Sequence, residues 1–412
     1  MKKFTLGVFF DYTLESGGNF QQSLNNIFLA KKLESTEINI KIITTEKDNK
    51  NILQKYGLDC ILYTPNIFSR LFMRFRESSS VFIYKLINLF FRKNHFENFL
   101  KNEQVDLIYF ITHSHFANYV NSVNYIFTLY DLCHRDNPEF PEVRSNRIFE
   151  YRENLFQKNL SRSVAVLVES ELGKKNAIFR YRLDEDRVHI FPIGPAHNIE
   201  KIKFNENNEK ITKQMDIKKK YDLKNDYLFY PAQFWAHKNH IYILKALKIL
   251  KSKKNIILNV IFSGSDRGNL SYIKDMTKKF NLENQVRFAG FVSSEEVNFL
   301  YSQALALVMP TYFGPTNMPP IEAFKFKVPV LYSNIKGLRE QVEDAALLLD
   351  LNDPNSLVEN LEKLLNSNEL RNDLVNKGQA KYNQIISNNN KNNYDVLKNI
   401  IENFKSRREC WK

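Results

Sequence analysis

The most constraining feature of this 412-residue sequence is an alternation of short apolar runs with longer segments whose apolar residues recur at helical spacing. Nearly continuous apolar runs are typical of strands in a parallel sheet buried on both faces. In the first half we expect strands at residues 4–10, 38–44, 105–112, 125–129, 164–168 and 188–192. In the second half we expect them at residues 227–230, 256–262, 286–288, 305–309 and 328–331.

The polar stretch at residues 196–225 separates the two series of strands and is typical of a connection between domains. We therefore predict the α/β class, with two Rossmann-like, doubly wound domains. The expected domains cover residues 1–195 and 196–390. Residues 391–412 are expected to form a C-terminal helix that packs back on the N-terminal domain.

The chain is basic, with a formal net charge of +13 from 59 Lys and Arg against 46 Asp and Glu. This balance favours an anionic partner such as a phosphorylated substrate, an anionic lipid or a nucleic acid. A compositional bias toward Lys and Asn, visible at residues 387–393, explains the same charge equally well.

The three cysteines (Cys60, Cys133 and Cys410) lie far apart without a CxxC pair. They indicate neither a disulfide framework nor a zinc site, and they fit a reducing cytosol. No run of 18 apolar residues predicts a membrane span. The apolar stretch at residues 4–10 ends at Asp11, so we interpret it as a first strand rather than a signal peptide. A cytoplasmic protein is expected.

Two polar segments follow expected strands of the first half. Gly17 and Gly18 lie between a strand and a helix, where backbone amides can approach an anion. Asp131 and His134 follow the strand at 125–129, at the edge where open α/β sheets bind ligands. They could act as acid and base or bind sugar hydroxyls. A plain tight turn, a helix-capping Asp and a surface His remain the structural alternatives.

Comparable segments follow strands of the second half. Gln233 and Lys238 lie between a strand and a helix, and Gly264 follows the strand at 256–262. A lysine at a helix N-terminus is electrostatically unfavourable unless an anion binds beside it. The alternative is a solvated lysine.

The loop at residues 310–323 combines Gly314, Thr316 and Asn317 with a proline-rich helix start and Glu322. Amides at such a helix start would suit a phosphate. We place Glu322 in the first turn, where simple compensation of the helix dipole is the alternative role.

Taken together, these segments resemble the GT-B glycosyltransferases of family 4, over most of the chain to about residue 378. The resemblance implies two domains facing a cleft, with the nucleotide-sugar donor in the C-terminal one. Glu322 matches the second Glu of the family's Glu-x7-Glu motif, which holds the nucleotide ribose, and Lys238 matches a lysine that grips the diphosphate. Asp131 and His134 resemble an acceptor-side motif of a subgroup in cell-surface polysaccharide synthesis.

Two positions differ from the usual family pattern. Gly314 stands where the first Glu is expected, and Gln233 stands where an arginine usually precedes Lys238. The ordered surroundings resemble a subgroup that carries both replacements, in which Asn317 takes over part of the sugar contact. Gly17, Gly18, Gly264 and Thr316 complete the expected donor site.

The resemblance also implies a chemistry without metal and without a cofactor, because the nucleotide-sugar is itself a substrate. Transfer would retain the anomeric configuration, and the acceptor would be a glycan or a lipid-linked glycan of the O-antigen or capsule type. Charge on the leaving diphosphate would be met by Lys238 and by the amides near Asn317.

Three rival functions remain open at this stage. A sugar-nucleotide epimerase of the same fold would act without an acceptor. A basic nucleic-acid binder would show affinity that falls steeply with salt, but no RRM, KH or helix-turn-helix signature is present, so we expect no nucleic-acid partner. A catalytically inactive scaffold would bind a sugar nucleotide without turnover.

The segment at residues 67–101 contains eight Phe and seven Lys or Arg against two acids. Phe68, Phe72 and Phe75 fall at helical spacing beside Arg70 and Arg74. A basic amphipathic helix of this kind lies in the interface of an anionic membrane, where lipid-linked acceptors are presented. This pattern predicts peripheral attachment to the inner face of the cytoplasmic membrane. The alternative is that these Phe residues pack under the N-terminal sheet.

Overall fold

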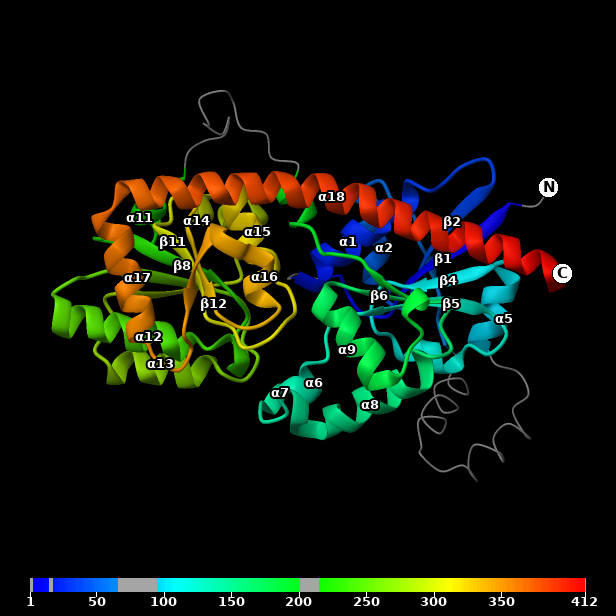
Figure 1. The fold of residues 1–412 in the computed structure, drawn as a ribbon, viewed down its shortest axis with the longest axis horizontal. Coiled ribbons are helices and arrows are strands. Elements are labelled where there is room, and N and C mark those ends of the chain that lie inside the picture. The colour runs from blue at the N-terminus through cyan, green and yellow to red at the C-terminus, as the bar shows by residue number, and fades with distance from the viewer. Residues whose placement is uncertain (1–2, 15–17, 66–94, 201–214, 412) are drawn as a thin grey trace. The chain divides into compact units, whose positions relative to one another are not determined.

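The computed structural model describes residues 3–14, 18–65, 95–200 and 215–411 (Figure 1). The chain divides into two compact units. The first unit is formed by residues 1–132, 150–192 and 390–412, and the second by residues 133–149 and 193–389. Two segments therefore belong to a different unit from the residues next to them in the sequence. Residues 133–149 pack with the second unit, and the last 23 residues belong to the first.

The first unit contains a seven-stranded parallel sheet in the order β3-β2-β1-β4-β5-β6-β7. Its strands are β1 (Phe4–Phe10), β2 (Ile38–Thr44), β3 (Ile61–Leu62), β4 (Leu107–Phe110), β5 (Asn124–Leu129), β6 (Ala165–Val168) and β7 (Val188–Ile190). Its helices are α1 (Gly18–Lys31), α2 (Asp48–Gln54), α5 (His95–Asn102), η1 (His115–Tyr119), α8 (Ile148–Asn159), α9 (Glu171–Tyr181) and η3 (Glu185–Arg187). The start of α8 belongs to the second unit.

The second unit contains a six-stranded parallel sheet in the order β10-β9-β8-β11-β12-β13. Its strands are β8 (Tyr227–Pro231), β9 (Asn259–Ser263), β10 (Val286–Gly290), β11 (Ala306–Met309), β12 (Val330–Ser333) and β13 (Ala346–Leu349). Its helical elements are α6 (Cys133–Asp136), α7 (Pro141–Arg144), η2 (Ser145–Arg147), α10 (His197–Glu200), α11 (Ile217–Lys220), η4 (Ala236–Lys238), α12 (His240–Ile249), η5 (Leu250–Lys254), α13 (Leu270–Lys279), α14 (Ser294–Ser302), α15 (Met318–Lys325), α16 (Leu338–Val342), η6 (Glu343–Ala345) and α17 (Asn355–Asn366).

The long helix α18 (Asn368–Arg408) contributes residues to both units and is followed by η7 (Glu409–Trp411). In the first unit, Leu397, Ile401 and Phe404 of this helix are buried in the same cluster as Phe4 and Leu6 of β1. None of the helices in the described ranges is long and apolar enough to cross a membrane.

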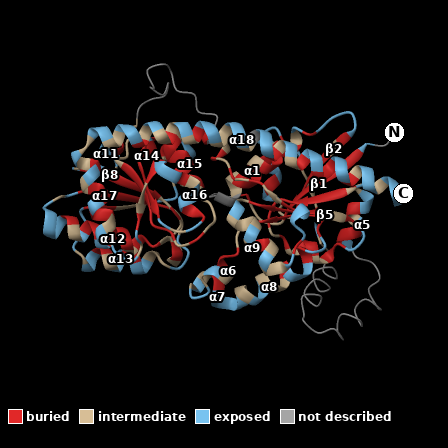
Figure 2. Cartoon of the chain, viewed as in Figure 1, coloured by how far each residue is buried: buried red, intermediate tan, exposed pale blue. Residues whose placement is uncertain are grey.

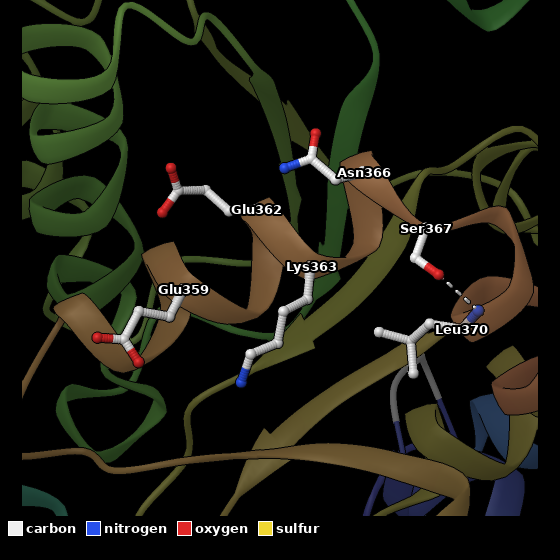
Figure 3. A pocket seen from close by; sticks show the side chains of 6 residues that line it. All are labelled: Glu359, Glu362, Lys363, Asn366, Ser367 and Leu370. Atoms are coloured by element: carbon white, nitrogen blue, oxygen red, sulfur yellow. Dashed lines mark hydrogen bonds between the residues drawn. The ribbon is translucent and has the colours of Figure 1, made fainter.

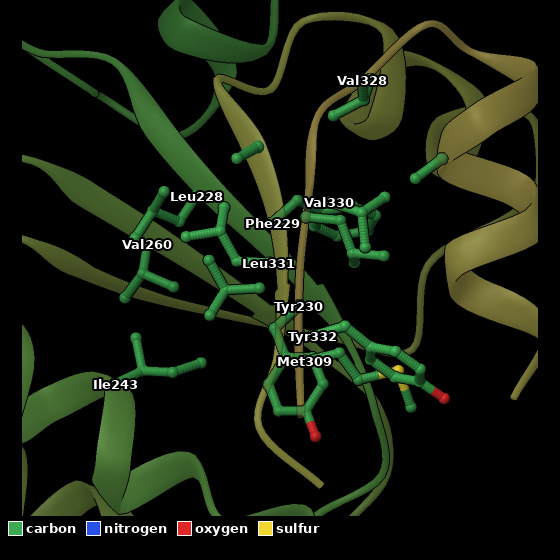
Figure 4. Close-up of a cluster of buried hydrophobic side chains, with 14 of the residues drawn as sticks. Leu228, Phe229, Tyr230, Ile243, Val260, Met309, Val328, Val330, Leu331 and Tyr332 are labelled. Carbon is green, nitrogen blue, oxygen red and sulfur yellow. The ribbon is translucent and has the colours of Figure 1, made fainter. Parts of the chain in front are cut away.

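Both sheets are buried on their two faces, as Figure 2 shows for the strands of each unit. In β4, Leu107 and Tyr109 belong to one buried cluster, whereas Ile108 and Phe110 belong to another. Successive residues of a strand point to opposite faces, so each face has its own core. In the second unit, Leu228 of β8, Val260 of β9 and Leu331 of β12 belong to one core (Figure 4). The sequence expectation of two doubly wound α/β domains is therefore confirmed.

Local signals in the sequence explain several helix starts. Ser293 caps α14, because its hydroxyl accepts a hydrogen bond from the Glu296 amide at 3.2 Å. Such a cap stabilises a helix by about 1 kcal/mol. The Glu296 side chain turns away and accepts from the Tyr221 hydroxyl at 2.6 Å. In this way the first turn of α14 is tied to the segment that precedes the second sheet.

Each sheet has a switch point, where the strand order reverses direction. In the first unit it lies between β1 and β4, and in the second unit between β8 and β11. The loops that follow two such strands diverge and leave room for a ligand beyond the carboxyl edge of the sheet. The structure thus directs attention to the loops after β1, β4, β8 and β11.

Candidate functional site

The switch point of the second unit brings together two of the segments expected from the sequence. The loop after β8 ends in η4, which contains Lys238, and the loop after β11 contains Asn317. The Lys238 Nζ atom donates to Asn317 Oδ1 at 3.2 Å, although the two residues are 79 positions apart. The backbone of this lysine is also fixed, because the Tyr230 hydroxyl donates to its carbonyl oxygen at 2.7 Å.

Lys238 is half-buried, and its electrostatic state is unusual. Burial lowers the pKa of Lys238 to about 8, whereas the charges of Cys133 and Glu142 act to raise it. The ammonium group therefore remains mostly protonated at pH 7, in a place where an anion would relieve the cost of its desolvation.

Asn317 is held by side chains that no sequence pattern pointed to. The backbone amide of Asn317 donates to Gln341 Oε1 at 3.0 Å, and Gln341 Nε2 donates to the backbone carbonyl oxygen of Asn317 at 2.7 Å. Its side-chain Nδ2 donates to the Tyr332 hydroxyl at 2.8 Å. Because the side-chain nitrogen Nδ2 is held by Tyr332, the side-chain oxygen Oδ1 points at Lys238.

The start of α15 offers fewer amides than the sequence analysis expected. Asn317 precedes the helix, and its amide is already bonded to Gln341. Pro319 and Pro320 follow in the first turn and have no amide hydrogen. Few amides of this helix start are therefore available to a phosphate, and Lys238 is a positive group beside them.

Gly314 has a conformational reason to be glycine. Its φ angle is +100°, and a Cβ atom placed there would lie 2.9 Å from the Thr316 carbonyl oxygen and 3.2 Å from Asn317 Nδ2. A side chain at this position would therefore displace the loop that carries Asn317. The conformation of the loop therefore favours Gly at position 314, where the family resemblance leads us to expect Glu.

Glu322 lies in the second turn of α15, so its placement in the first turn is corrected. The residue is only 8% exposed, and its Oε2 atom accepts from the Tyr301 hydroxyl at 2.8 Å. Burial raises the pKa of Glu322, against the opposing effect of hydrogen bonds from Tyr301 and the Ala196 backbone. Compensation of the helix dipole does not explain a carboxyl group held in this way.

Gln233 and Gly264 lie at the ends of neighbouring strands. The Gln233 side-chain oxygen accepts from Trp235 Nε1 at 3.1 Å. A Cβ atom on Gly264 would lie 2.4 Å from the Ala232 carbonyl oxygen, so this glycine permits a close approach of two backbones. It shapes the loop from which η4 begins.

Residues 133–149 add groups to this site that the sequence analysis did not predict. Glu142 Oε1 accepts from the His237 amide at 2.8 Å and also contacts His237 Nδ1. The His237 ring stacks on Phe313 with centroids 4.1 Å apart. The spacing in sequence, 95 residues between Glu142 and His237, left no local signal for this pair.

His134 lies in this same segment and therefore in the second unit, not in the N-terminal half where we expected it. It is fully buried, and its ring packs edge-on against Phe149 with centroids 5.4 Å apart. The alternative of a surface histidine is wrong. A direct contact of this ring with an acceptor would require the segment to open.

The first unit places other polar groups beyond the carboxyl edge of its own sheet. Asp11, after β1, accepts from the Ser114 hydroxyl at 2.8 Å and lies 3.1 Å from His115 Nδ1. Asp131, after β5, accepts from Arg152 Nη2 at 2.6 Å. Gly18 is the first residue of α1, whereas the expectation for Gly17 lies outside the described residues.

A shallow surface pocket on α17 and the start of α18 contains none of these residues (Figure 3). It is lined by Glu359, Glu362, Lys363, Asn366, Ser367 and Leu370. The Ser367 hydroxyl accepts from the Leu370 amide at 3.0 Å, as in a helix cap. Its polar atoms therefore serve the helix start, and we assign no chemistry to it.

The amphipathic segment with Phe68, Phe72 and Phe75 lies outside the described residues. Its C-terminal end is described as α5, where Phe96 is fully buried and packs against Phe9 with ring centroids 5.1 Å apart. For Phe96, packing under the first sheet is therefore confirmed, and no membrane contact of this residue is proposed.

Comparison with known proteins gives one family match. Residues 211–381 match the family described as "Glycosyl transferases group 1". The matched range begins before β8 and ends within α18, so it contains Lys238, Asn317 and Glu322. It lies entirely within the second unit.

Two curated relatives are enzymes of O-antigen synthesis by name. The chain is 24% identical over 254 residues to O-antigen chain mannosyltransferase B of Escherichia coli, which covers 59% of this chain and 62% of the relative. It is 30% identical over 175 residues to the O-antigen chain mannosyltransferase RfbU of Salmonella typhimurium, with 42% and 48% covered. The chain thus matches about half to three fifths of the lengths of these relatives.

Among solved structures, the chain is similar to Anabaena HepE in complex with UDP and glucose. The TM-score is 0.71 at 14% identity, with 97% of this chain and 100% of HepE covered. This likeness concerns the fold, which is that of the GT-B glycosyltransferases.

Proposed function

We propose that this protein is a retaining glycosyltransferase that moves a hexosyl group from a nucleotide-sugar to a glycan or lipid-linked acceptor in cell-surface polysaccharide synthesis. The observation that carries the proposal is the half-buried Lys238, held against Asn317 at the switch point of the second sheet. The family match over the same residues and the two O-antigen mannosyltransferases support it. Mannose is accordingly the first donor sugar to test.

The donor diphosphate is assigned to Lys238. A desolvated ammonium group interacts with a phosphate much more strongly than a solvated one, because the local dielectric is low. Its hydrogen-bond partner Asn317 is neutral, so this contact does not cancel the positive charge. The Asn317 side chain is then placed to bind a hydroxyl or a phosphate oxygen.

Glu322 is assigned to the ribose of the donor. One of its oxygens is held by the Tyr301 hydroxyl, and this contact fixes the carboxyl group from within the unit. A carboxyl group with a fixed orientation can accept hydrogen bonds from the two hydroxyls of a ribose. Gln233, Gly264, Gly314 and Thr316 complete the proposed donor site of the second unit, of which Gly264 and Gly314 act through the shape of their loops.

The proposed reaction forms a bond between an acceptor oxygen and the anomeric carbon while the bond from that carbon to the diphosphate breaks. Retention places the incoming oxygen on the face that the phosphate leaves, and the acceptor proton passes to the leaving phosphate oxygen. Negative charge grows on the diphosphate during this step, and Lys238 is positioned to stabilise it. No cofactor is assigned, because the donor is consumed as a substrate.

The acceptor side is assigned to Asp131, with His134 supporting the neighbouring segment. The Asp131 side chain is 26% exposed and oriented by Arg152. We place the reaction at the cytoplasmic face of the membrane, where residues 67–101, apart from the buried Phe96, would bring the protein to a lipid-linked acceptor. The comparisons favour neither an epimerase nor a nucleic-acid binder.

The test is product analysis by mass spectrometry. Purified protein is incubated with a panel of nucleotide-sugars, GDP-mannose and UDP-hexoses among them, together with lipid-linked glycan acceptors. We expect a mass gain of one hexose on an acceptor for at least one donor. Conversion of the donor to an epimer without an acceptor would identify the alternative enzyme, and donor binding without turnover would identify a scaffold.

A further inference from the structure

Residues 133–149 dock on the second unit through an aromatic cluster. Phe140 contacts Tyr312 and Phe313, with ring centroids 5.4 and 5.0 Å apart. Cys133 and Val143 are buried with Phe313 in the same small cluster. Since Tyr312 and Phe313 belong to the loop after β11, the segment is fastened to the loop that also carries Asn317.

Glu142 is the charged residue that this docking buries. Its side chain is 7% exposed. Burial alone would raise the pKa of Glu142, but the hydrogen bonds from the His237 ring and backbone outweigh it and lower the pKa. Within the described residues, the second carboxylate oxygen Oε2 is buried without a hydrogen-bond partner. The negative charge of Glu142 therefore lies beside His237, the residue that precedes Lys238, and only one of its two carboxylate oxygens is hydrogen-bonded in the described part of the chain.

The backbone around His237 ties this pair to both loops of the site. The Tyr312 amide donates to the His237 carbonyl oxygen at 2.9 Å. The His237 ring stacks on Phe313, and its amide and Nδ1 face Glu142. The backbone amide, the backbone carbonyl and the ring of His237 are thus all held in place. These contacts also restrict the position of the next residue, Lys238.

Several titratable groups surround Lys238. Glu142 and Cys133 approach from the docked segment, and His237 and His240 belong to its own loop. His240 is buried, and burial lowers the pKa of its ring to about 3, so this residue stays neutral. Asn317 faces Lys238 from the other loop and carries no charge. Glu142 is therefore the carboxylate of this set, whereas His240 and Asn317 are neutral.

We propose that Glu142 is a positioning residue of the second unit's site, which fixes His237 and keeps Lys238 protonated in its half-buried place. The proposal deepens the proposed function, and it rests on it for the role of Lys238. It also gives residues 133–149 a reason to pack with the second unit. Position 314 carries Gly and therefore no carboxylate. Glu142 supplies a carboxylate to the site from a distant part of the chain instead.

The charge and the shape of Glu142 can be separated by substitution. Glu142→Gln keeps the size of the side chain, and its amide oxygen can still accept from the His237 backbone. It removes the negative charge, so the protonated form of Lys238 loses stabilisation and the pKa of Lys238 falls. A nearby opposite charge shifts a pKa by roughly 1–3 units, so we expect a fall on the order of one unit.

The experiment measures Lys238 directly in the protein without substrate. The full chain is labelled with trace acetic anhydride between pH 6 and pH 10, and the reactivity of Lys238 against pH is read by mass spectrometry. Wild type is compared with Glu142→Gln, with Glu142→Asp, and with Glu139→Gln. Glu139 is exposed on the same segment and serves as the matched control.

We expect the pKa of Lys238 to be lowest in Glu142→Gln, intermediate in Glu142→Asp and unchanged in Glu139→Gln. The alkaline limb of the kcat/KM profile for the donor should move to lower pH in the same order. Equal shifts in the Gln and Asp variants would show a loss of shape rather than of charge and would overturn the proposal. A wild-type value in Glu142→Gln would overturn it as well.

The labelling result stands apart from the proposed activity. If no donor supports transfer but the pKa of Lys238 follows the charge at position 142, the proposed function fails and the coupling of Glu142 to Lys238 holds. If transfer occurs but the pKa of Lys238 does not move, the proposed function holds and Glu142 has no such role.

Discussion

The two sheets have corresponding switch points, but the side chains placed there differ in charge. In the first unit, the loops after β1 and β4 bring Asp11 to the Ser114 hydroxyl and to His115. In the second unit, the loops after β8 and β11 bring Lys238 to Asn317. The strand order provides the same place twice, and the loop residues decide which ligand it suits.

This difference matches the two substrates of the proposed reaction. A carboxylate and a hydroxyl, as in the first unit, suit neutral sugar hydroxyls, because they accept and donate hydrogen bonds without requiring a counter-charge. A desolvated lysine, as in the second unit, suits a diphosphate. The comparison therefore assigns the donor to the second unit and the acceptor to the first, and each prediction below tests one side of this division.

The largest effect is expected for Lys238→Ala. Its charge stabilises the leaving diphosphate as the bond breaks, so kcat should fall about 10²–10³-fold, with a smaller rise in donor KM. Steady-state kinetics measures both. Lys245→Ala, an exposed lysine on α12, is the control and should behave as wild type. A change in KM alone would mean that Lys238 binds only the ground state.

Glu322→Gln tests the donor side without opening a cavity. Loss of a hydrogen bond to a charged group costs about 1.5–3 kcal/mol, so donor KM should rise roughly 10–150-fold while acceptor KM stays constant. The Gln side chain can still accept from the Tyr301 hydroxyl. Unchanged donor kinetics would remove Glu322 from the site.

The same variant carries a pH prediction for stability. Burial raises the pKa of Glu322 above its ordinary value of 4.5. The folded state then binds more protons than the unfolded state, and its stability falls as pH rises from 4.5 through the folded pKa. Glu322→Gln lacks this loss, so its Tm should exceed that of wild type at pH 7.5 and approach it at pH 4. If the calorimetric Tm values of wild type and Glu322→Gln differed by the same amount at every pH, this prediction would be contradicted.

Gly314→Ala tests the loop that carries Asn317. A residue with a side chain at positive φ costs about 1–2 kcal/mol. Gly268→Ala is a matched control, because its φ of +97° is close to the +100° of Gly314 but no atom lies within 4 Å of its Cβ position. Gly314→Ala should lower Tm further than Gly268→Ala and should also lower kcat. Gly314→Glu should not raise activity, and a gain would show that the missing Glu is a loss of function.

The smallest effect is expected on the acceptor side. Asp131→Asn keeps an oxygen for Arg152 but loses its charge, so acceptor KM should rise several-fold, equivalent to about 1 kcal/mol, with donor affinity unchanged. Donor affinity is measured by isothermal titration calorimetry. Asp184→Asn, at an exposed position of the same unit, is the control. An equal loss of donor affinity would break the division between the units.

The sequence predicted the sheets well where strands are long and buried on both faces. The range expected for β2 agrees with the structure, and the run at residues 4–10 is β1. β3 has only two residues, Ile61 and Leu62, too few to show a period. β13 (Ala346–Leu349) follows directly on a short helical turn, so its apolar run could not be separated from a helix by pattern.

For the candidate site, Lys238 and Asn317 were selected from sequence because they lie between a strand and a helix, whereas Glu322 was selected through the family resemblance. Local chemistry could not find the residues that hold them. Gln341 and Tyr332 lie in the next βα unit, and Glu142 reaches His237 across 95 residues. Such pairings depend on packing between elements, and they leave no periodicity or spacing in one sequence.

The most direct test of the division between the units is hydrogen–deuterium exchange with the nucleotide-sugar that supports turnover. We predict that the donor slows exchange in peptides covering residues 231–239 and 310–322, and that Lys238→Ala weakens this protection. Peptides around Asp11 and Asp131 should change only when an acceptor is added. Donor protection confined to the first unit, with none in those two segments, would contradict the account.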